Sequence, residues 1–244
     1  MSTFVLVHGG GHRSWHWNLV APLLRDRGHQ VITPEVPMDS PGAGAADWAD
    51  AIIADLATAG NPDDVILVGH SLSGLAIPVV AATYPLERLV FLCANVPEVG
   101  RSYENYLAEH PTAVIMPPIT LDQDGCLELS WPDARRLYYG DCEESLALSA
   151  WEHLVRSAAL TAFTETSPLQ AWPTGTPTSY ILCTEDEIIG PDWSREVCRT
   201  RLQITPIELP GSHSPMLSRP SELVDALCSL ADSSPISQET TALP

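Results

Sequence analysis

The fold is decided by one stretch of the sequence, Val65-Ile66-Leu67-Val68-Gly69-His70-Ser71-Leu72-Ser73-Gly74. Its apolar, β-branched first half predicts a buried strand, and a helical pattern follows directly. The join is of the G-x-S-x-G type, with Ser73 at the spacing of the second glycine and Gly74 immediately after it. Such a join is a sharp turn that strains the serine backbone and leaves its hydroxyl exposed above a sheet. We therefore predict that Ser71 is a nucleophile and that Ser73 supports the turn.

Strands and helices alternate on both sides of this stretch. Apolar runs predict strands over residues 3–8, 30–34, 64–68, 89–93, 177–183 and 204–209, and helical patterns cover residues 17–24, 47–59, 72–83, 191–201 and 218–230. This alternation predicts an α/β fold with a mostly parallel sheet flanked by helices. It stops between residues 100 and 175, where Trp, Tyr, Pro and acidic residues are more frequent. We predict one core (1–99 and 176–231), a small cap insertion (100–175) and a flexible tail (232–244).

A serine hydroxyl is a weak nucleophile and needs a general base, which in turn needs an acid to orient it. Among the eight histidines, His213 lies in a turn between the last predicted strand and the last predicted helix. The chain order Ser…acid…His places the base in that turn. The loop after the 177–183 strand offers three acids, Glu185, Asp186 and Glu187, and the residues alone do not choose among them.

The turn after the first strand, Gly9-Gly10-Gly11, fits an oxyanion hole. Acyl transfer needs N–H groups aimed at the developing oxyanion, and we expect these from Leu72 and Gly10. The turn does not match G-x-G-x-x-G, and no acid follows at the distance of a ribose contact, which argues against a dinucleotide site. We expect Gly9, Trp131 and Tyr138 to line the substrate pocket, although packing inside the cap would explain the two aromatic residues equally well.

Composition excludes several classes of function. Acids outnumber bases 31 to 12, the formal net charge is -19, and every base is an arginine. Nucleic-acid binding needs clustered positive charge, and Schiff-base and P-loop chemistry both need a lysine, so we expect none of them. An anionic substrate would need an arginine such as Arg135 or Arg136. His8, His12 and His16 are spaced by four, but the glycines between them indicate a loop, and we predict no metal and no cofactor.

The remaining expectations concern the setting of the protein. The six cysteines contain no C-x-x-C pair, and the N-terminus has no basic leader followed by an apolar core. No apolar run approaches the roughly 18 residues that span a bilayer. We therefore expect free thiols and a cytoplasmic protein that acts on a small molecule, without a membrane or nucleic-acid partner. The sequence does not decide the oligomeric state, and a homodimer is possible.

Four separated motifs resemble the α/β-hydrolase superfamily, and within it the plant methylesterase and hydroxynitrile lyase group with its bacterial esterase relatives. The first-strand segment Phe4-Val-Leu-Val-His8-Gly9, followed by His12, Trp15 and Trp17, carries this likeness together with the acid loop Thr184-Glu-Asp-Glu-Ile188. In that group the aspartate before Glu-Ile is the triad acid, so the resemblance implies Asp186. The likeness is vague through the insertion, which would be the substrate-covering cap.

The departures from that group bear on the reaction. Its lyases carry Thr after the first-strand His and Lys after the catalytic His, where this chain has Gly9 and Ser214. The lyase lysine stabilises departing cyanide, and this chain has no lysine, so the resemblance implies an esterase acting on a small or medium apolar ester such as a methyl ester or lactone. Two alternatives stay open: epoxide opening or lactone chemistry in natural-product tailoring at the same site, and a non-catalytic ligand-binding receptor. Epoxide and haloalkane hydrolases of this fold usually carry Asp as nucleophile, which Ser71 does not match.

Overall fold

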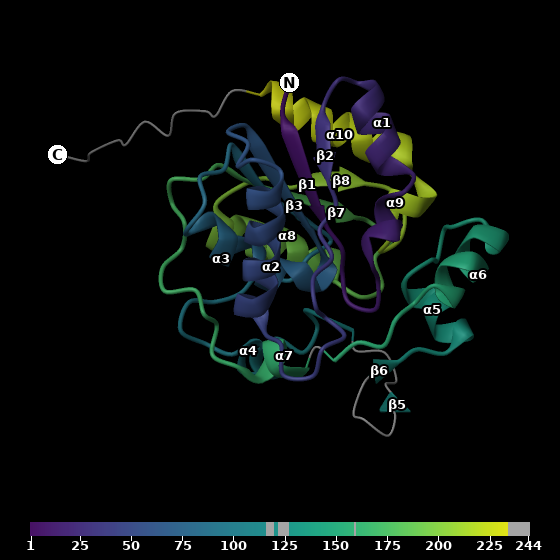
Figure 1. The fold of residues 1–244 in the computed structure, drawn as a ribbon. Coiled ribbons are helices and arrows are strands. Elements are labelled where there is room, and N and C mark those ends of the chain that lie inside the picture. The colour runs from purple at the N-terminus through teal and green to yellow at the C-terminus, as the bar shows by residue number, and fades with distance from the viewer. Residues whose placement is uncertain (116–119, 122–126, 159, 234–244) are drawn as a thin grey trace.

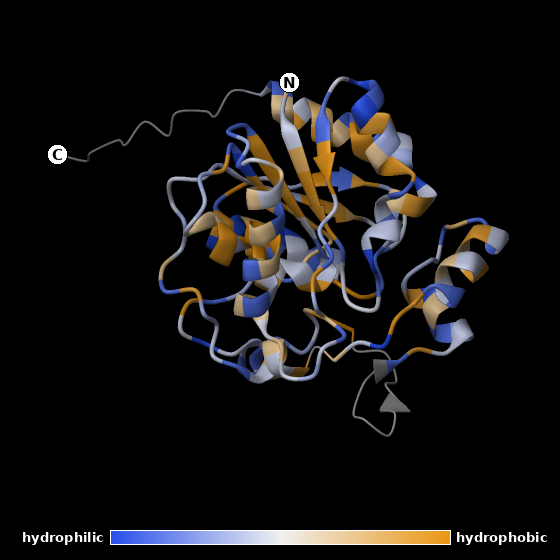
Figure 2. Cartoon of the chain, viewed as in Figure 1, coloured by the Kyte–Doolittle hydropathy of each residue, from blue (hydrophilic) through white to orange (hydrophobic). Residues whose placement is uncertain are grey.

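A six-stranded sheet forms the centre of the molecule (Figure 1). The structure is a computed structural model that describes residues 1–115, 120–121, 127–158 and 160–233. All neighbouring strands of this sheet are parallel, as the alternating pattern predicts. In spatial order they are β2 (Gln30–Ile32), β1 (Thr3–Val7), β3 (Val65–His70), β4 (Arg88–Leu92), β7 (Thr178–Cys183) and β8 (Ile207–Leu209). The central strands are apolar and buried on both faces, and Figure 2 shows them in orange.

Helices cover both faces of the sheet. One face packs against α2 (Ala45–Thr58), α3 (Ile77–Ala81) and α8 (Pro191–Val197). The other packs against α1 (Val20–Asp26), α9 (Pro215–Ser218) and α10 (Pro220–Asp232). The two layers confirm the predicted class, a parallel sheet flanked by helices. Within the described ranges, no helix combines the length and apolar character needed to cross a membrane.

The elements between β4 and β7 all fall within residues 100–175. They are α4 (Tyr103–Glu109), β5 (Thr120–Leu121), β6 (Leu127–Glu128), α5 (Trp131–Leu137), α6 (Glu144–Glu152) and α7 (Leu160–Thr164). In Figure 1, α5 and α6 form a pair that stands out to one side of the sheet, and α4 packs beside α7 below it. The two short strands pair antiparallel, separately from the central sheet. From residue 234 onward, the predicted tail lies outside the described residues.

A proline divides one helix that the sequence pattern predicts as continuous, and another proline sets where a second helix begins. Instead of one helix over 72–83, a 3-10 helix η2 (Ser71–Leu75) is followed by α3, which has Pro78 in its first turn. The helix predicted over 218–230 is α10, which begins at Pro220 and follows the short helix α9. Proline lacks an N–H and clashes with the preceding turn, so it fits the start of a helix and not its interior. The remaining short elements are the 3-10 helix η1 (Ser14–Trp17) and a π-helical turn η3 (Cys198–Leu202).

The turn between β3 and η2 has the strained geometry that the motif predicts. Ser71 has φ +55°, in the left-handed region that non-glycine residues rarely occupy. Ser73 supports the turn, because its hydroxyl donates a 2.8 Å hydrogen bond to the carbonyl of His70. Gly74 provides the close approach, since a Cβ there would lie 2.0 Å from the carbonyl oxygen of Asn95. The backbone after β4 therefore packs directly against the turn that carries Ser71.

We expect Gly74→Ala to destabilise the protein by about 3 kcal/mol, the upper end for overpacking, because the obstacle is backbone that cannot turn aside. Urea denaturation measures the change in the midpoint. Gly175→Ala is the matched control, because nothing lies within 4 Å of a Cβ at Gly175. Equal midpoints for the two variants would contradict the proposed packing.

Candidate active site

Three side chains meet at the carboxyl edge of the sheet. Ser71 follows β3, Asp186 follows β7 and His213 follows β8. The Ser71 Oγ lies 2.9 Å from His213 Nε2, and His213 Nδ1 lies 2.8 Å from Asp186 Oδ2. A hydroxyl, an imidazole and a carboxylate in this order can generate a serine nucleophile.

The structure selects Asp186 among the three neighbouring acids. Its Oδ1 accepts hydrogen bonds from the backbone N–H groups of Ile188 (2.8 Å) and Ile189 (3.0 Å), while Oδ2 faces the imidazole. Both oxygens of this buried side chain therefore have hydrogen-bond partners, which fixes the orientation of the carboxylate. Glu185 is exposed, and Glu187 pairs at 2.5 Å with Arg136. Of the three acids, only Asp186 forms a hydrogen bond with His213.

Gly10 and Leu72 lie together beside Ser71. Both line the same cavity as Ser71, and a Cβ on Gly10 would lie 3.1 Å from Leu72 Cδ2. Leu72 is the residue after the nucleophile, at the start of η2. The two expected oxyanion-hole residues are thus brought together from β1 and β3, although 62 positions separate them in the chain (72 minus 10).

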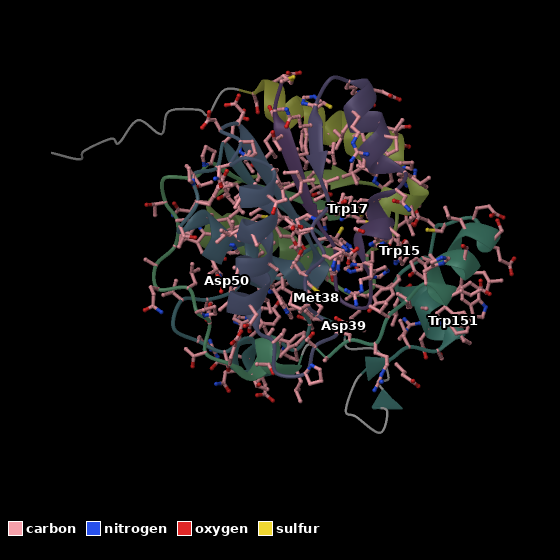
Figure 3. All side chains as sticks on the ribbon, in the orientation of Figure 1. Trp15, Trp17, Met38, Asp39, Asp50 and Trp151 are labelled. Atoms are coloured by element: carbon pink, nitrogen blue, oxygen red, sulfur yellow. The ribbon has the colours of Figure 1, made fainter. Side chains whose placement is uncertain are left out.

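The cavity above Ser71 has a volume of about 420 Å³. Its walls are mostly apolar, with a few polar side chains. The lining residues are Gly10, Gly11, Ser71, Leu72, Asn95, Val114, Glu128, Leu129, Tyr138, Trp151, Leu154, Val155, Arg156, Ser157, Phe163, Ile188 and Ile189. Trp151 reaches it from α6, which Figure 3 shows projecting beside the core.

Of the three expected pocket residues, the structure places one in the cavity wall and two elsewhere. Tyr138 lines the cavity, and its ring stacks on that of His213 with centroids 5.9 Å apart. Trp131, at the start of α5, is not among the lining residues. Its ring packs on that of Trp151, with centroids 5.8 Å apart. Gly9 also lies outside the wall, since a Cβ there would be 2.9 Å from Ser71 Cβ. Gly9 is therefore a close contact behind the nucleophile, with no room for a larger residue.

Buried histidines lie next to Ser71, His213 and the Gly10 turn. The Nδ1–H of His12 donates to the Gly10 carbonyl (2.9 Å), and its Nε2 accepts from the Tyr139 hydroxyl (2.9 Å). His16 stacks on His12 with centroids 3.8 Å apart. The Nε2–H of His70 donates to the carbonyl of His213 at 2.8 Å. These contacts hold the oxyanion loop and the His213 loop, a role that the spacing of the histidines does not indicate.

Burial keeps these histidines neutral. Desolvation lowers the pKa of His12 to about 3 and the pKa values of His16 and His70 well below the ordinary 6.5. Both ring nitrogens of His8 and of His12 have hydrogen-bond partners in the protein. Those of His8 contact the Gly9 carbonyl at 3.0 Å and the Val36 N–H at 3.2 Å. This arrangement explains the four-residue spacing by packing and hydrogen bonding.

Asp141 is a residue of the site that the sequence patterns missed. It lies between α5 and α6, and its Oδ1 accepts from the backbone N–H (3.1 Å) and the hydroxyl (2.5 Å) of Ser212. Its Oδ2 accepts from Arg219 Nε at 3.2 Å. Burial alone would raise the pKa of Asp141, but the hydrogen bonds from Ser212 outweigh it and the pKa is lowered. An acid of the insertion thus fixes the residue before His213, and no local pattern could reveal a partner 71 positions away.

The neutral histidines predict a loss of stability in acid. A histidine whose folded pKa lies below its unfolded value binds fewer protons in the native state, so the free energy of unfolding falls as the pH drops below 6.5. With a folded pKa of about 3, His12 alone would cost about 2 kcal/mol at pH 5. We expect His16→Phe, which removes one such ring, to reduce the loss of stability between pH 7.5 and pH 5 in urea unfolding. The same loss in both proteins would contradict this origin of the acid sensitivity.

Comparisons with known proteins show which family and fold the chain shares. The model of the alpha/beta hydrolase family matches residues 4–226. Methylesterase 9 of Arabidopsis thaliana is 28% identical over 257 residues, covering 96% of this chain and 100% of the relative. A carbendazim hydrolyzing esterase of Nocardioides sp. (strain SG-4G) is 40% identical over 110 residues, covering 42% of this chain and 46% of the relative.

The solved structure of a pyrethroid hydrolase from Sphingobium faniae JZ-2 superposes with a TM-score of 0.78 at 23% identity, covering 95% of this chain and 98% of that one. These findings confirm the fold and the resemblance to methylesterases and bacterial esterases. Because the family model spans nearly the whole chain, the chain belongs to the alpha/beta hydrolase family.

Proposed function

We propose that the protein is a serine hydrolase of the carboxylesterase type. The observation that carries this proposal is the hydrogen-bonded series Ser71–His213–Asp186, whose serine lines a mostly apolar cavity. The relatives described above are named methylesterase, esterase and hydrolase, which supports the cleavage of an ester.

The reaction would proceed through an acyl-enzyme. Ser71 Oγ attacks the ester carbonyl while His213 Nε2 takes its proton, and Asp186 holds the imidazole and stabilises its charged form. The N–H groups of Leu72 and Gly10 bind the oxyanion. The intermediate then collapses, and His213 passes the proton to the departing alcohol. Water, deprotonated by the same histidine, releases the acid and restores Ser71.

The cavity supports a small or medium ester with apolar groups. Its volume of about 420 Å³ is within the range of small-molecule sites. Arg135 and Arg136, considered above for an anionic substrate, are engaged elsewhere: Arg135 donates to the carbonyls of Tyr139 and Cys142, and Arg136 pairs with Glu187. With a formal charge of -19, the protein also repels anions at long range. We propose methyl esters and lactones as the first substrates to test, with residues 100–175 acting as the cap over the cavity.

Ser71→Ala should reduce kcat for an ester by a factor on the order of 10⁴–10⁶, because no other hydroxyl contacts His213 Nε2 in the described structure. The measurements are ester turnover and labelling by a fluorophosphonate probe. Ser73→Ala is the matched control and should still be labelled at Ser71, since the Ser73 hydroxyl bonds the His70 carbonyl.

Failure of the probe to label the folded wild-type protein would favour the ligand-binding alternative. Turnover of epoxides with refusal of simple esters would favour the epoxide alternative.

Asp186→Asn should lower kcat by a factor on the order of 10³–10⁴ with the fold retained, because an amide can present its N–H₂ to His213 Nδ1 and so favour the wrong tautomer. Steady-state kinetics on one ester measures the effect. Glu187→Gln replaces the adjacent acid, which is exposed and does not contact the imidazole, and should stay near the wild-type rate. Equal losses in the two variants would contradict the assignment of Asp186.

A further inference from the structure

One side of the cavity wall presents an amide close to the nucleophile. Asn95 follows β4 and is only 3% exposed, yet it lines the cavity together with Val114, Phe163 and Ile189. Its backbone N–H donates to the carbonyl of Ser71 at 3.0 Å. The residue is thus attached to the same turn that carries the reacting hydroxyl.

Tyr103 orients this amide. Its hydroxyl donates a 3.1 Å hydrogen bond to Asn95 Oδ1, and the Tyr103 ring is itself buried against Tyr106 and Phe163. Burial raises the pKa of Tyr103 well above its ordinary value, so the hydroxyl keeps its proton and acts as a donor. The amide oxygen of Asn95 therefore accepts from Tyr103, and the amino group points in a different direction.

The amino group of Asn95 opens to the cavity. Among the described residues, Nδ2 has no hydrogen-bond partner, and it is not one of the unpartnered polar atoms sealed inside the protein. A donor in a mostly apolar wall loses a hydrogen bond with water when an apolar ligand covers it, at a cost of about 1–3 kcal/mol. A ligand that brings an acceptor to this position avoids that loss.

The topology says which part of a substrate meets this donor. In the sheet, β1 and β4 flank β3 on opposite sides, so Gly10 and Asn95 approach Ser71 from opposite sides. An oxyanion held by Gly10 and Leu72 points toward the β1 side. The substituents of the reacting carbonyl on the other side therefore face Asn95.

We propose that Asn95 determines specificity by selecting esters with a hydrogen-bond acceptor, an ether, hydroxyl or carbonyl oxygen, within a few bonds of the reacting carbonyl. This inference rests on the proposed esterase function and names the substrate class of that site. Asn95 Nδ2 donates to the acceptor, and Tyr103 acts as the positioning residue that orients the amide.

A pair of matched esters tests the inference. Methyl 2-methoxy-2-phenylacetate and methyl 2-phenylbutanoate differ by one oxygen in place of one methylene, and each enantiomer is assayed separately. A second pair, methyl 2-methoxybenzoate and methyl 2-ethylbenzoate, places the oxygen one bond further from the carbonyl. The readout is the ratio of kcat/KM for the ether ester to that for the alkyl ester, compared between wild type and Asn95→Leu, so that intrinsic reactivity cancels.

In at least one pair, we expect this ratio to fall by about three- to tenfold in Asn95→Leu, the size of one net hydrogen bond. Tyr103→Phe should lower the ratio in the same direction with less effect on the alkyl ester, because the amide loses its orienting contact. Val114→Ala, a change in the same wall without a polar group, should alter both rates and leave the ratio unchanged. Thermal unfolding of each variant confirms that it is folded.

Ratios that are unchanged in Asn95→Leu for both pairs would overturn the inference while leaving the esterase proposal intact. Absence of hydrolysis of any ester by the wild-type protein would instead overturn the proposed function. The two failures are therefore distinguishable.

Discussion

At Ser71 the chain leaves the middle of a parallel sheet and enters a helix within one residue. The turn holds Ser71 at φ +55°, a conformation that costs on the order of 1–3 kcal/mol in a non-glycine residue. Packing must supply that energy, and the close approach of the Asn95 backbone to Gly74 leaves no room for a Cβ beside the turn. The same contact, with the hydrogen bond from the Asn95 N–H to the Ser71 carbonyl, holds the end of β4 against the nucleophile. Reactivity at Ser71 and the position of the cavity wall therefore depend on one close backbone approach.

The remaining groups reach the site because the sheet is parallel. Carboxyl ends of parallel strands meet at one edge, so residues far apart in the chain become neighbours there. Ser71 and His213 are 142 positions apart and lie within hydrogen-bond distance, while Gly10 arrives from β1 and Asp186 from β7. The buried histidines lie behind this edge and hold it through carbonyl contacts, His12 on Gly10 and His70 on His213.

Much of this arrangement was predictable because its signals are local. Buried strands leave continuous apolar runs, and the strand–turn–helix around Ser71 is a contiguous motif. Asp186 required the family resemblance, since Glu185 and Glu187 are equivalent in composition and only the fold turns one acid toward the imidazole. The division of the helix near Pro78 and the start of α10 at Pro220 could have been predicted from the prolines themselves. The role of Asp141 could not, because its partner Ser212 belongs to a distant loop.

Residues 100–175 do more than supply part of the cavity wall. Arg136 pairs with Glu187 next to Asp186, Tyr139 donates to His12 behind Gly10, and Asp141 holds Ser212 next to His213. Three residues within the six-residue segment 136–141 thus contact residues that neighbour Asp186, Gly10 and His213. The buried contact of Tyr139 and the partly buried contacts of Asp141 are worth more than the exposed Arg136–Glu187 pair, which solvent screens. Displacing this segment as a body would disturb the oxyanion loop and the His213 loop together, so the geometry of catalysis and the enclosure of the cavity are set by the same contacts.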